Sequence, residues 1–367
     1  MKIIADNTIP YLKGIAEPIA EVKYLNSKEF TPGNIHDADA LIVRSIDKCT
    51  RELLEGSRVK LITTATIGFD HIDTKYCDEA GITWKNAPGC NAVSVAQYIL
   101  ASLITVALRR KESLQGKTIG IVGVGHVGKE LEKLCTAYGL HVLRNDPPRA
   151  EAEGSKGFVS LDTIAQESDI FSFHTPLTKE GRFMTRHLAN EDFFGKTRKK
   201  PWFVNASRGA VHDTGALLTA LKSGQISEAI IDCWENEPAI DRELLDRVSI
   251  ATPHIAGFSA DGKANGTRTC LENIERFFDI KIEKLGEVIP PAPTDPVIDL
   301  DGVADQRIEY AVLRSFNPLA IDQILRETPD KFEWFRANYQ HPREFAAYTI
   351  KNATAEERKL FDQLGFR

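Results

Sequence analysis

The feature of this sequence that most constrains its fold is the glycine run Gly123-Val-Gly125-His-Val-Gly128. It follows the apolar stretch Thr118–Val122 and precedes a predicted helix at Lys129–Tyr138. Gly123 would permit a tight turn, Gly125 would let the backbone approach a pyrophosphate, and Gly128 would let the helix pack on the strand. The helix N-terminus would offer free amides and partial positive charge to the phosphates. The spacing alone is a weak signal, but its strand and helix context predicts a dinucleotide-binding unit.

A carboxylate stands where such a unit binds the adenosine ribose. Asp146 lies eighteen residues past Gly128, at the end of the next predicted strand, His141–Arg144. A 2′-phosphate beside this carboxylate would be repelled by roughly 1–4 kcal/mol at a surface-like dielectric, so the sequence favours NAD over NADP. Arg149 is close enough in sequence to soften that preference. The alternative interpretation is that Asp146 only caps the turn before Pro147-Pro148.

Short apolar strands alternate with helical stretches along most of the chain, which predicts parallel α/β sheets. The strands expected in residues 1–85 are Lys2–Ala5, Val22–Leu25, Ala40–Val43, Leu61–Thr64 and Ile82–Trp84. Those expected after residue 117 are Thr118–Val122, His141–Arg144, Ile170–Phe173, Trp202–Val204, Ala229–Asp232 and Val248–Ala251. The helices expected between them include Thr50–Gly56, Thr74–Gly81, Ser94–Leu114 and Thr214–Ser223, the last capped by Asp213.

The segment from Glu287 to Pro296 holds four prolines and is typical of a stiff linker. The tail after it, residues 297–367, should form a strand, two helices, a strand and a helix, with helices at Ala304–Ser315 and Phe332–Tyr339. So short a segment builds only a small core, which favours oligomerisation through it. The predicted fold is therefore two Rossmann-like, doubly wound parallel-sheet domains plus a small α+β C-terminal dimerisation domain. Their boundaries should be 1–90 with 255–285 (substrate), 91–254 (NAD) and 286–367 (homodimer).

Composition excludes several other classes. The formal net charge is −6 and no dominant basic stripe appears, which argues against nucleic acid as the main partner. The six cysteines are scattered, without the spacing of a zinc site or disulfide framework, so no metal is expected. The N-terminus turns polar at once, unlike a signal peptide, and the apolar stretch Tyr98–Leu108 is too short to span a bilayer. A cytoplasmic protein with no membrane partner is expected.

Three polar residues follow three successive predicted strands, where doubly wound sheets place their sites: Arg208, Glu237 and His254. Arginine can fix a carboxylate through a planar, two-pronged donor. Histidine titrates near neutral pH and can take and return a hydroxyl proton, while a glutamate on its other ring nitrogen would orient it. Each alone could be a surface ion pair, a loop charge or a turn residue. Together, after a dinucleotide fingerprint, they predict hydride transfer at the C2 carbon of a 2-hydroxy acid.

The motifs around these residues are long and specific, and they resemble the D-isomer-specific 2-hydroxyacid dehydrogenase family over about residues 1–280. The motifs are Asn205-Ala-Ser-Arg-Gly-Ala, Asp232-x-Trp-Glu-x-Glu-Pro and Thr252-Pro-His-Ile-Ala-Gly. The resemblance implies that Arg208, Glu237 and His254 are catalytic. It further implies substrate contacts at Ser45, Thr66 and position 258, and an NAD site lined by Asp146, Thr175, Ala206, Asp232 and Gly257. Phe258 departs from the tyrosine common in the most similar members; a lost hydroxyl contact would cost roughly 0.5–1.5 kcal/mol.

Further motifs, such as Ala87-Pro-Gly-Cys-Asn91 and Asp146-Pro-Pro-Arg149, resemble members of the family that act on a phosphorylated hydroxy acid. A phosphate needs a cation, and the candidates are Arg44 and a tail arginine, Arg336 or Arg343, contributed by a partner subunit. Surface positions for the tail arginines are the competing interpretation. Two other functions stay open: a family member acting on 3-phosphoglycerate, glycerate or formate, and a non-catalytic NAD-sensing scaffold.

Overall fold

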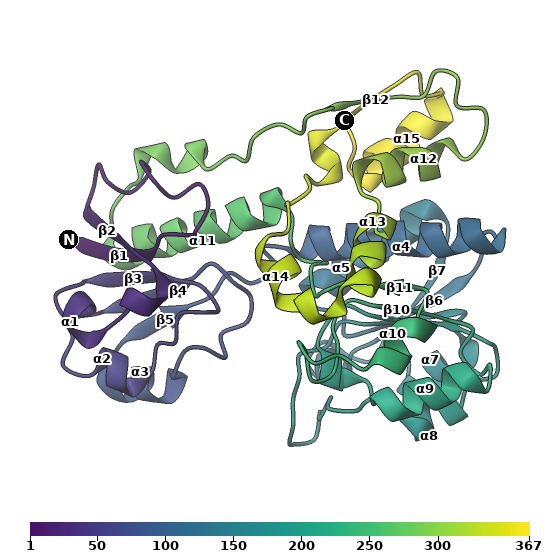
Figure 1. The fold of residues 1–367 in the computed structure, drawn as a ribbon, viewed down its shortest axis with the longest axis horizontal. Coiled ribbons are helices and arrows are strands. Elements are labelled where there is room, and N and C mark those ends of the chain that lie inside the picture. Colours follow the sequence, from purple (N-terminus) through teal and green to yellow (C-terminus); the bar gives the residue numbers. More distant parts are fainter. The chain divides into compact units, whose positions relative to one another are not determined.

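The computed structural model describes all residues from 1 to 367, and the chain divides into two compact units (Figure 1). The first unit comprises Met1–Asn91 and Ser259–Pro291, and the second comprises Ala92–Phe258 and Ala292–Arg367. The C-terminal tail therefore groups with the segment that carries the glycine run. The three-domain division expected from the sequence, with its dimerisation domain at 286–367, stays a prediction.

The first unit is built on a five-stranded parallel sheet in the order β2-β1-β3-β4-β5. Ile3 and Ile42 point into the core on one face of this sheet, and Ile4 and Leu41 into the core on the other. Because both faces are buried, these strands are continuous apolar runs in the sequence. The strands are β1 (Lys2–Asp6), β2 (Glu21–Leu25), β3 (Ala40–Val43), β4 (Leu61–Thr64) and β5 (Thr83–Lys85), and the helices are α1 (Pro32–Ile35), α2 (Arg51–Leu54), α3 (Thr74–Ala80) and α11 (Ala260–Phe278).

The second unit holds a six-stranded parallel sheet in the order β11-β10-β9-β8-β6-β7. The chain order reverses at β6, which lies between β7 and β8, and ligands of such sheets bind beyond the carboxyl ends at this reversal. The strands are β6 (Thr118–Val122), β7 (His141–Asn145), β8 (Ile170–Phe173), β9 (Trp202–Asn205), β10 (Glu228–Ile231) and β11 (Ile250–Ala251). The helices before the tail are α4 (Ala92–Arg110), α5 (His126–Tyr138), α6 (Pro147–Glu153), α7 (Leu161–Glu167), α8 (Glu191–Gly195), α9 (Thr214–Lys222) and α10 (Arg242–Arg247).

Helix α4 is the long apolar helix expected at Ser94–Leu114, and it packs against α5. By length and composition it could cross a membrane, but 83% of its apolar window is buried inside the fold. Its apolar residues are buried almost all round, from Val95 to Ala107. That is the pattern of a core helix enclosed by other elements of its own unit.

Within the second unit, the tail packs onto the helices that surround the six-stranded sheet. Its strands β12 (Val297–Asp299) and β13 (Thr349–Lys351) pair in parallel, and its helices are α12 (Arg307–Ser315), α13 (Leu319–Glu327), α14 (Phe332–Ala337) and α15 (Ala355–Leu364). Helix α12 lies on α4 and α15 on α5, burying Val312, Phe345 and Phe361 completely or nearly so. The tail thus buries part of its apolar surface against its own chain, while Val297, Tyr310, Ile324 and Trp334 stay exposed. Dimerisation through the tail stays a prediction.

Two details of the predicted tail are wrong. Three α-helices, not two, separate its strands, because α13 was not foreseen. This helix protects the sheet edge: Asp322 Oδ1 accepts a hydrogen bond of 2.7 Å from the Ala251 amide of edge strand β11. The guanidinium of Arg326 is paired with Asp322 and also donates to the carbonyls of Leu245 and Val248. The predicted helices at Ala304–Ser315 and Phe332–Tyr339 are shorter, at Arg307–Ser315 and Phe332–Ala337.

Candidate active site

The three candidate catalytic residues lie at the carboxyl ends of three adjacent strands. Arg208 follows β9, Glu237 follows β10 and His254 follows β11, and these strands are neighbours in the sheet. Because parallel strands end at the same edge, their loops meet there (Figure 1). Sequence order alone could not give this adjacency; the strand order supplies it.

Glu237 and His254 form a hydrogen-bonded pair. His254 Nδ1 lies 2.5 Å from Glu237 Oε1, and Glu237 Oε2 accepts from the Trp234 amide at 3.2 Å. Burial alone would raise the pKa of Glu237, but the hydrogen bond and charge of His254, with smaller help from Trp234 and Arg336, lower it below 4.5. An ionised Glu237 fixes the proton on Nδ1, so Nε2, which has no partner in the chain, is left as the acceptor.

His254 occupies a strained backbone conformation, with φ of +56°. Such left-handed geometry is uncommon outside glycine and persists only where neighbours enforce it, often at functional sites. Here Asp232, only 1% exposed, accepts from Thr252 Oγ1 and from the Ile255 and Ala256 amides. The Tyr98 hydroxyl on α4 lies 2.7 Å from Thr252 Oγ1. The loop that carries His254 is therefore fixed from two sides.

Arg208 is positioned through its backbone. Its carbonyl accepts a hydrogen bond of 2.9 Å from Asn205 Nδ2, and the same amide lies 2.8 Å from His212 Nδ1. Asn205 Oδ1 accepts from the amide and the hydroxyl of Ser207. The guanidinium itself donates only to the Ser207 carbonyl, at 2.8 Å. Most of its donors are thus available to a ligand.

The Arg208 loop and the Glu237 loop touch at a glycine. A Cβ at Gly209 would lie 1.9 Å from the Trp234 carbonyl oxygen, so any side chain there would push the two loops apart. The resemblance motif Ser-Arg-Gly therefore has a packing cause in this structure. A side chain at position 209 would disturb Arg208 and Glu237 together.

The glycine run has the geometry of a phosphate-binding turn. Gly123 has φ of +89°, and a Cβ there would lie 2.8 Å from the His174 carbonyl carbon. A Cβ at Gly128 would lie 2.3 Å from the Gly123 oxygen, which would separate helix from strand. Gly125 faces open space, and no side chain caps α5 at that residue. The first amides of α5 are thus available to phosphates, as NAD requires.

Two residues at the ends of the strands on either side of β6 also fit a dinucleotide. Asp146, after β7, accepts from the Val124 amide at 2.8 Å and caps α6 through the Arg149 amide. Asp146 therefore does cap α6, and its role toward a ribose stays a prediction. Arg149 is committed to Glu153 and to the Val124 carbonyl. Thr175, after β8, keeps a buried hydroxyl without a partner beside Gly123.

A second histidine–glutamate pair lies in the same unit and was not foreseen. His187 Nε2 lies 2.6 Å from Glu235 Oε1, and His187 also has a positive φ, +52°. Its Nδ1 lies 3.5 Å from Asp213, and Glu235 Oε2 accepts from the amide and hydroxyl of Thr214. Burial would raise the pKa of Glu235, but the hydrogen bonds from His187 and Thr214 lower it. Both His187 and Glu235 thus have a further partner in the chain, Asp213 and Thr214 respectively.

The substrate contacts expected in the first unit lie at neighbouring strand ends there. Ser45 follows β3 and is exposed, and Thr66 follows β4 and is half-buried. Thr66 Oγ1 donates to the Gly68 carbonyl and lies 2.8 Å from Thr64 Oγ1. Arg44 donates to Thr8 Oγ1, and its amide donates to Asp47 at 2.8 Å.

Comparison with known proteins agrees with this arrangement. Residues 102–256 match the family described as D-isomer specific 2-hydroxyacid dehydrogenase, NAD binding domain. An erythronate-4-phosphate dehydrogenase of Porphyromonas gingivalis is 53% identical over 367 residues, covering 100% of both chains. The chain belongs to the D-isomer-specific 2-hydroxyacid dehydrogenase family. It is an NAD-dependent oxidoreductase that acts on a CH–OH group.

A second relative and a solved structure support the same family. An erythronate-4-phosphate dehydrogenase of Bacteroides thetaiotaomicron is 52% identical over 351 residues, covering 95% of this chain and 99% of that one. The solved 3-phosphoglycerate dehydrogenase of Entamoeba histolytica with bound NAD+ is 28% identical, with a TM-score of 0.63, covering 76% of this chain and 95% of that one. The Rossmann fold and the cofactor NAD, both predicted from sequence, are therefore confirmed for this dehydrogenase.

The tail contributes side chains next to the candidate catalytic residues of its own chain. Phe258 is half-buried, and its ring centroid lies 6.5 Å from that of Tyr339 and 5.8 Å from that of His341. The Arg336 guanidinium lies 5.7 Å from the Phe258 ring, and its Nε donates to the His254 carbonyl at 3.3 Å. The expectation named Arg336 only as a residue from a partner subunit; in the structure it reaches this site within one chain.

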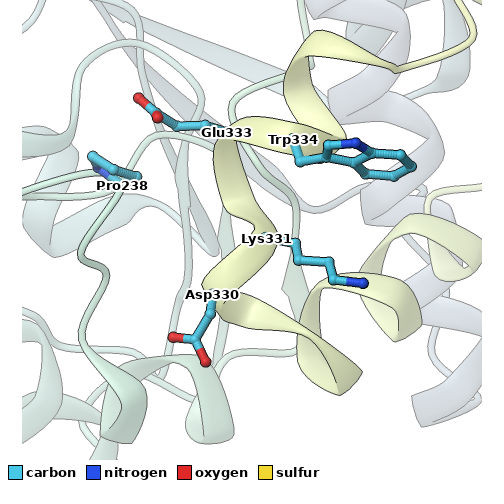
Figure 2. A pocket seen from close by; sticks show the side chains of 5 residues that line it. All are labelled: Pro238, Asp330, Lys331, Glu333 and Trp334. Atoms are coloured by element: carbon cyan, nitrogen blue, oxygen red, sulfur yellow. The ribbon is translucent and has the colours of Figure 1, made fainter.

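A cavity of about 550 Å³ lies at the start of α14 and is lined by Pro238, Asp330, Lys331, Glu333 and Trp334. Figure 2 shows that Lys331 and Trp334 extend away from Pro238 on the facing loop. The lining mixes two acids with one lysine, and its side chains do not converge on one point. The candidate catalytic residues do not line this cavity.

Proposed function

We propose that this dehydrogenase oxidises 4-phospho-D-erythronate to 2-oxo-3-hydroxy-4-phosphobutanoate with NAD, as a step of pyridoxal 5′-phosphate biosynthesis. The observation that carries the substrate is the 53% identity, over the full length of both chains, to a relative named erythronate-4-phosphate dehydrogenase. The chemistry is supported by the hydrogen-bonded His254–Glu237 pair beside Arg208.

In this proposal each catalytic residue has one task. Arg208 binds the substrate carboxylate with the guanidinium donors that the chain does not use, and polarises the adjacent C2 oxygen. His254 accepts the C2-hydroxyl proton on Nε2, because Glu237 keeps the other proton on Nδ1 and stabilises the resulting imidazolium. NAD, when bound at this site, would supply the acceptor for the C2 hydride. In the reverse direction His254 returns the proton.

The residues that would hold NAD lie at the carboxyl ends of the strands, beginning at β6, where the strand order reverses. Gly123, Gly125 and Gly128 would hold the pyrophosphate at the N-terminus of α5. Asp146 would bind the adenosine ribose, and Arg149, which could otherwise offer its charge to a 2′-phosphate, is paired with Glu153. Thr175, with its unpartnered hydroxyl, together with Ala206, Asp232 and Gly257, would line the rest.

The resemblance also assigns substrate contacts to Ser45, Thr66 and Phe258. The proposed domain roles are substrate binding for 1–90 with 255–285, NAD binding for 91–254, and homodimerisation for 286–367. The proposed location is the cytoplasm. Light scattering coupled to size-exclusion chromatography tests the dimer. Twice the chain mass supports it. A chain that has the mass of a monomer, and that loses only the mass of the tail when the tail is truncated, contradicts it.

The experiment that tests the function is NADH formation with 4-phospho-D-erythronate, 3-phosphoglycerate, glycerate and D-lactate. The proposal predicts the highest kcat/KM for 4-phospho-D-erythronate. A clear preference for another acid would keep the family and discard the substrate. No turnover of any acid, with NAD binding intact, would favour the NAD-sensing scaffold.

A further inference from the structure

One arginine of the tail lies beside the His254–Glu237 pair with its charge largely unused. Arg336 sits on α14 and is half-buried. Its Nε donates to the His254 carbonyl at 3.3 Å, and its guanidinium lies over the Phe258 ring. These contacts fix the plane of the group and leave the two terminal nitrogens, a fork suited to phosphate or carboxylate, without an acceptor in the chain.

Other arginines of the tail serve a structural role. Arg307 pairs with Glu357 and donates to the carbonyls of Leu300 and Val303. Arg326 pairs with Asp322 and with two carbonyls, and Arg358 donates to the Ile350 carbonyl. In each of these three arginines both terminal nitrogens donate hydrogen bonds within the chain. Arg336 differs from these three because its single hydrogen bond uses only Nε.

Two cations act on the same small region of the second unit. The pKa of the Cys233 thiol is raised by burial and by the charges of Asp232 and Glu237, while Arg208 and Arg336 both oppose the rise. Arg336 also contributes to the lowered pKa of Glu237, after burial and His254. Both arginines therefore act at short range on residues beside the His254–Glu237 pair.

We propose that Arg336 binds the phosphate group of the substrate within the same chain, while Arg208 binds its carboxylate. This inference rests on the proposed function, which gives the substrate one anionic group at each end. The planar fork of Arg336 matches a phosphate monoester, and stacking on Phe258 holds that fork in place. The tail thus determines specificity for a phosphorylated hydroxy acid, and Phe258 is the platform for this arginine.

The test compares two substrates that differ only in the phosphate, 4-phospho-D-erythronate and D-erythronate. Arg336→Ala should lower kcat/KM for the phosphorylated substrate by about ten- to a hundredfold, chiefly through KM, which is the range for a lost charged hydrogen bond. Activity with D-erythronate should fall by at least about fivefold less than activity with the phosphorylated substrate, since a general disturbance of the site would lower both equally. Arg336→Lys should recover only part of the loss, because it restores charge without the fork.

Arg314→Ala is the matched control. Arg314 lies on α12 of the same tail, is 59% exposed, and has only a 3.8 Å ion pair with Asp295. Its removal should leave both substrates unaffected. The affinity for NAD should also be unchanged in Arg336→Ala; weaker NAD binding would mean that the arginine serves the cofactor pyrophosphate, which overturns the proposal.

A binding assay separates this inference from the proposed function. Calorimetric titration with inorganic phosphate should show binding to the wild-type enzyme and a loss of at least about tenfold in Arg336→Ala. That result, with no turnover of 4-phospho-D-erythronate by wild type, would refute the proposed function and keep the phosphate site. Equal phosphate binding by both proteins, or equal loss of kcat/KM for both substrates, would overturn the role of Arg336.

Discussion

His254–Glu237 and His187–Glu235 are two versions of one arrangement within the same unit. Both pairs join a ring nitrogen to a carboxylate oxygen, at 2.5 and 2.6 Å, and both histidines have φ near +55°. They differ at the other ring nitrogen: His187 Nδ1 lies 3.5 Å from Asp213, whereas His254 Nε2 has no partner in the chain. The comparison separates two histidines of the same backbone conformation and carboxylate pairing by one feature, and we propose that the available nitrogen of His254 is what permits proton transfer.

The surroundings of the two pairs make the same distinction. Glu235 uses its second oxygen to hold Thr214 at the start of α9, so its pair ties loops together. Glu237 uses its second oxygen on Trp234, the residue before Glu235, and its loop follows β10, the neighbour of the strand that leads to Arg208. We therefore propose that the His187–Glu235 pair stabilises the loops around it and that the His254–Glu237 pair performs the chemistry.

The largest expected effect comes from breaking the proposed catalytic pair. His254→Asn should lower kcat by at least about a hundredfold, the lower end for removal of a general acid–base group. Asparagine is the suitable replacement because it tolerates a left-handed backbone. Steady-state rates with 4-phospho-D-erythronate give the result, and unchanged NAD affinity shows that the fold is retained. A loss below tenfold would remove His254 from the mechanism.

The next effect comes from neutralising Glu237. Glu237→Gln should lower kcat by about ten- to a hundredfold, since the amide no longer stabilises the imidazolium. The lowered pKa of Glu237 also makes the free energy of unfolding depend on pH. The stabilisation from ionised Glu237 is present above pH 4.5 and is lost as the pH falls through the pKa of Glu237 in the folded state, which is lower than 4.5. Urea denaturation should thus show wild type more stable than the variant at pH 7 and the difference shrinking below pH 4.5. A constant difference would contradict the pairing.

A smaller effect should follow from breaking the structural pair. His187→Asn should reduce the free energy of unfolding by about 1–3 kcal/mol, because it leaves Glu235 without its partner. The rate with saturating substrate should fall by less than about tenfold, since no proton passes through this pair. Denaturant unfolding and steady-state kinetics measure the two effects. A large rate loss with normal stability would erase the distinction between the pairs.

The last effect concerns stability in acid and not the reaction rate, and it comes from a buried histidine, His212. Burial lowers the pKa of His212 to about 4 from 6.5, so the unfolded state binds more protons between these values. Stability should therefore fall as pH drops from 6.5 to about 4, by roughly 1.4 kcal/mol per pH unit from this residue. His212→Asn should reduce that slope while an amide oxygen still accepts from Asn205. An unchanged slope would show that His212 is not the source of the acid sensitivity.

Much of the fold was predictable because both faces of the sheets are buried. The strands Ala40–Val43, Leu61–Thr64, Thr118–Val122 and Ile170–Phe173 have the predicted bounds, since continuous apolar runs between turns leave little choice. Strand β11 is shorter than the predicted Val248–Ala251, because Val248 instead caps α10. Helix α13 was missed, as its role at the sheet edge depends on contacts distant in sequence.

The candidate site was predictable where a motif encodes local geometry. The glycine run and the three strand-end residues were found because each motif sits in its own turn. His187, Asn205 and Arg336 were assigned no role within one chain, because their partners are brought to them only by the fold. Two signals could have pointed to them: polar residues at the ends of predicted strands, and an arginine within the aromatic segment of the tail.

The most direct test of the central claim is the initial rate of NADH formation from 4-phospho-D-erythronate by wild type, His254→Asn and His187→Asn under identical conditions. The two substitutions are the same, in two pairs of the same geometry. If the available nitrogen of His254 moves the proton, wild type and His187→Asn turn over, and His254→Asn is slower than wild type by at least about a hundredfold. Equal losses in both variants, or a near-normal rate in His254→Asn, would contradict the account.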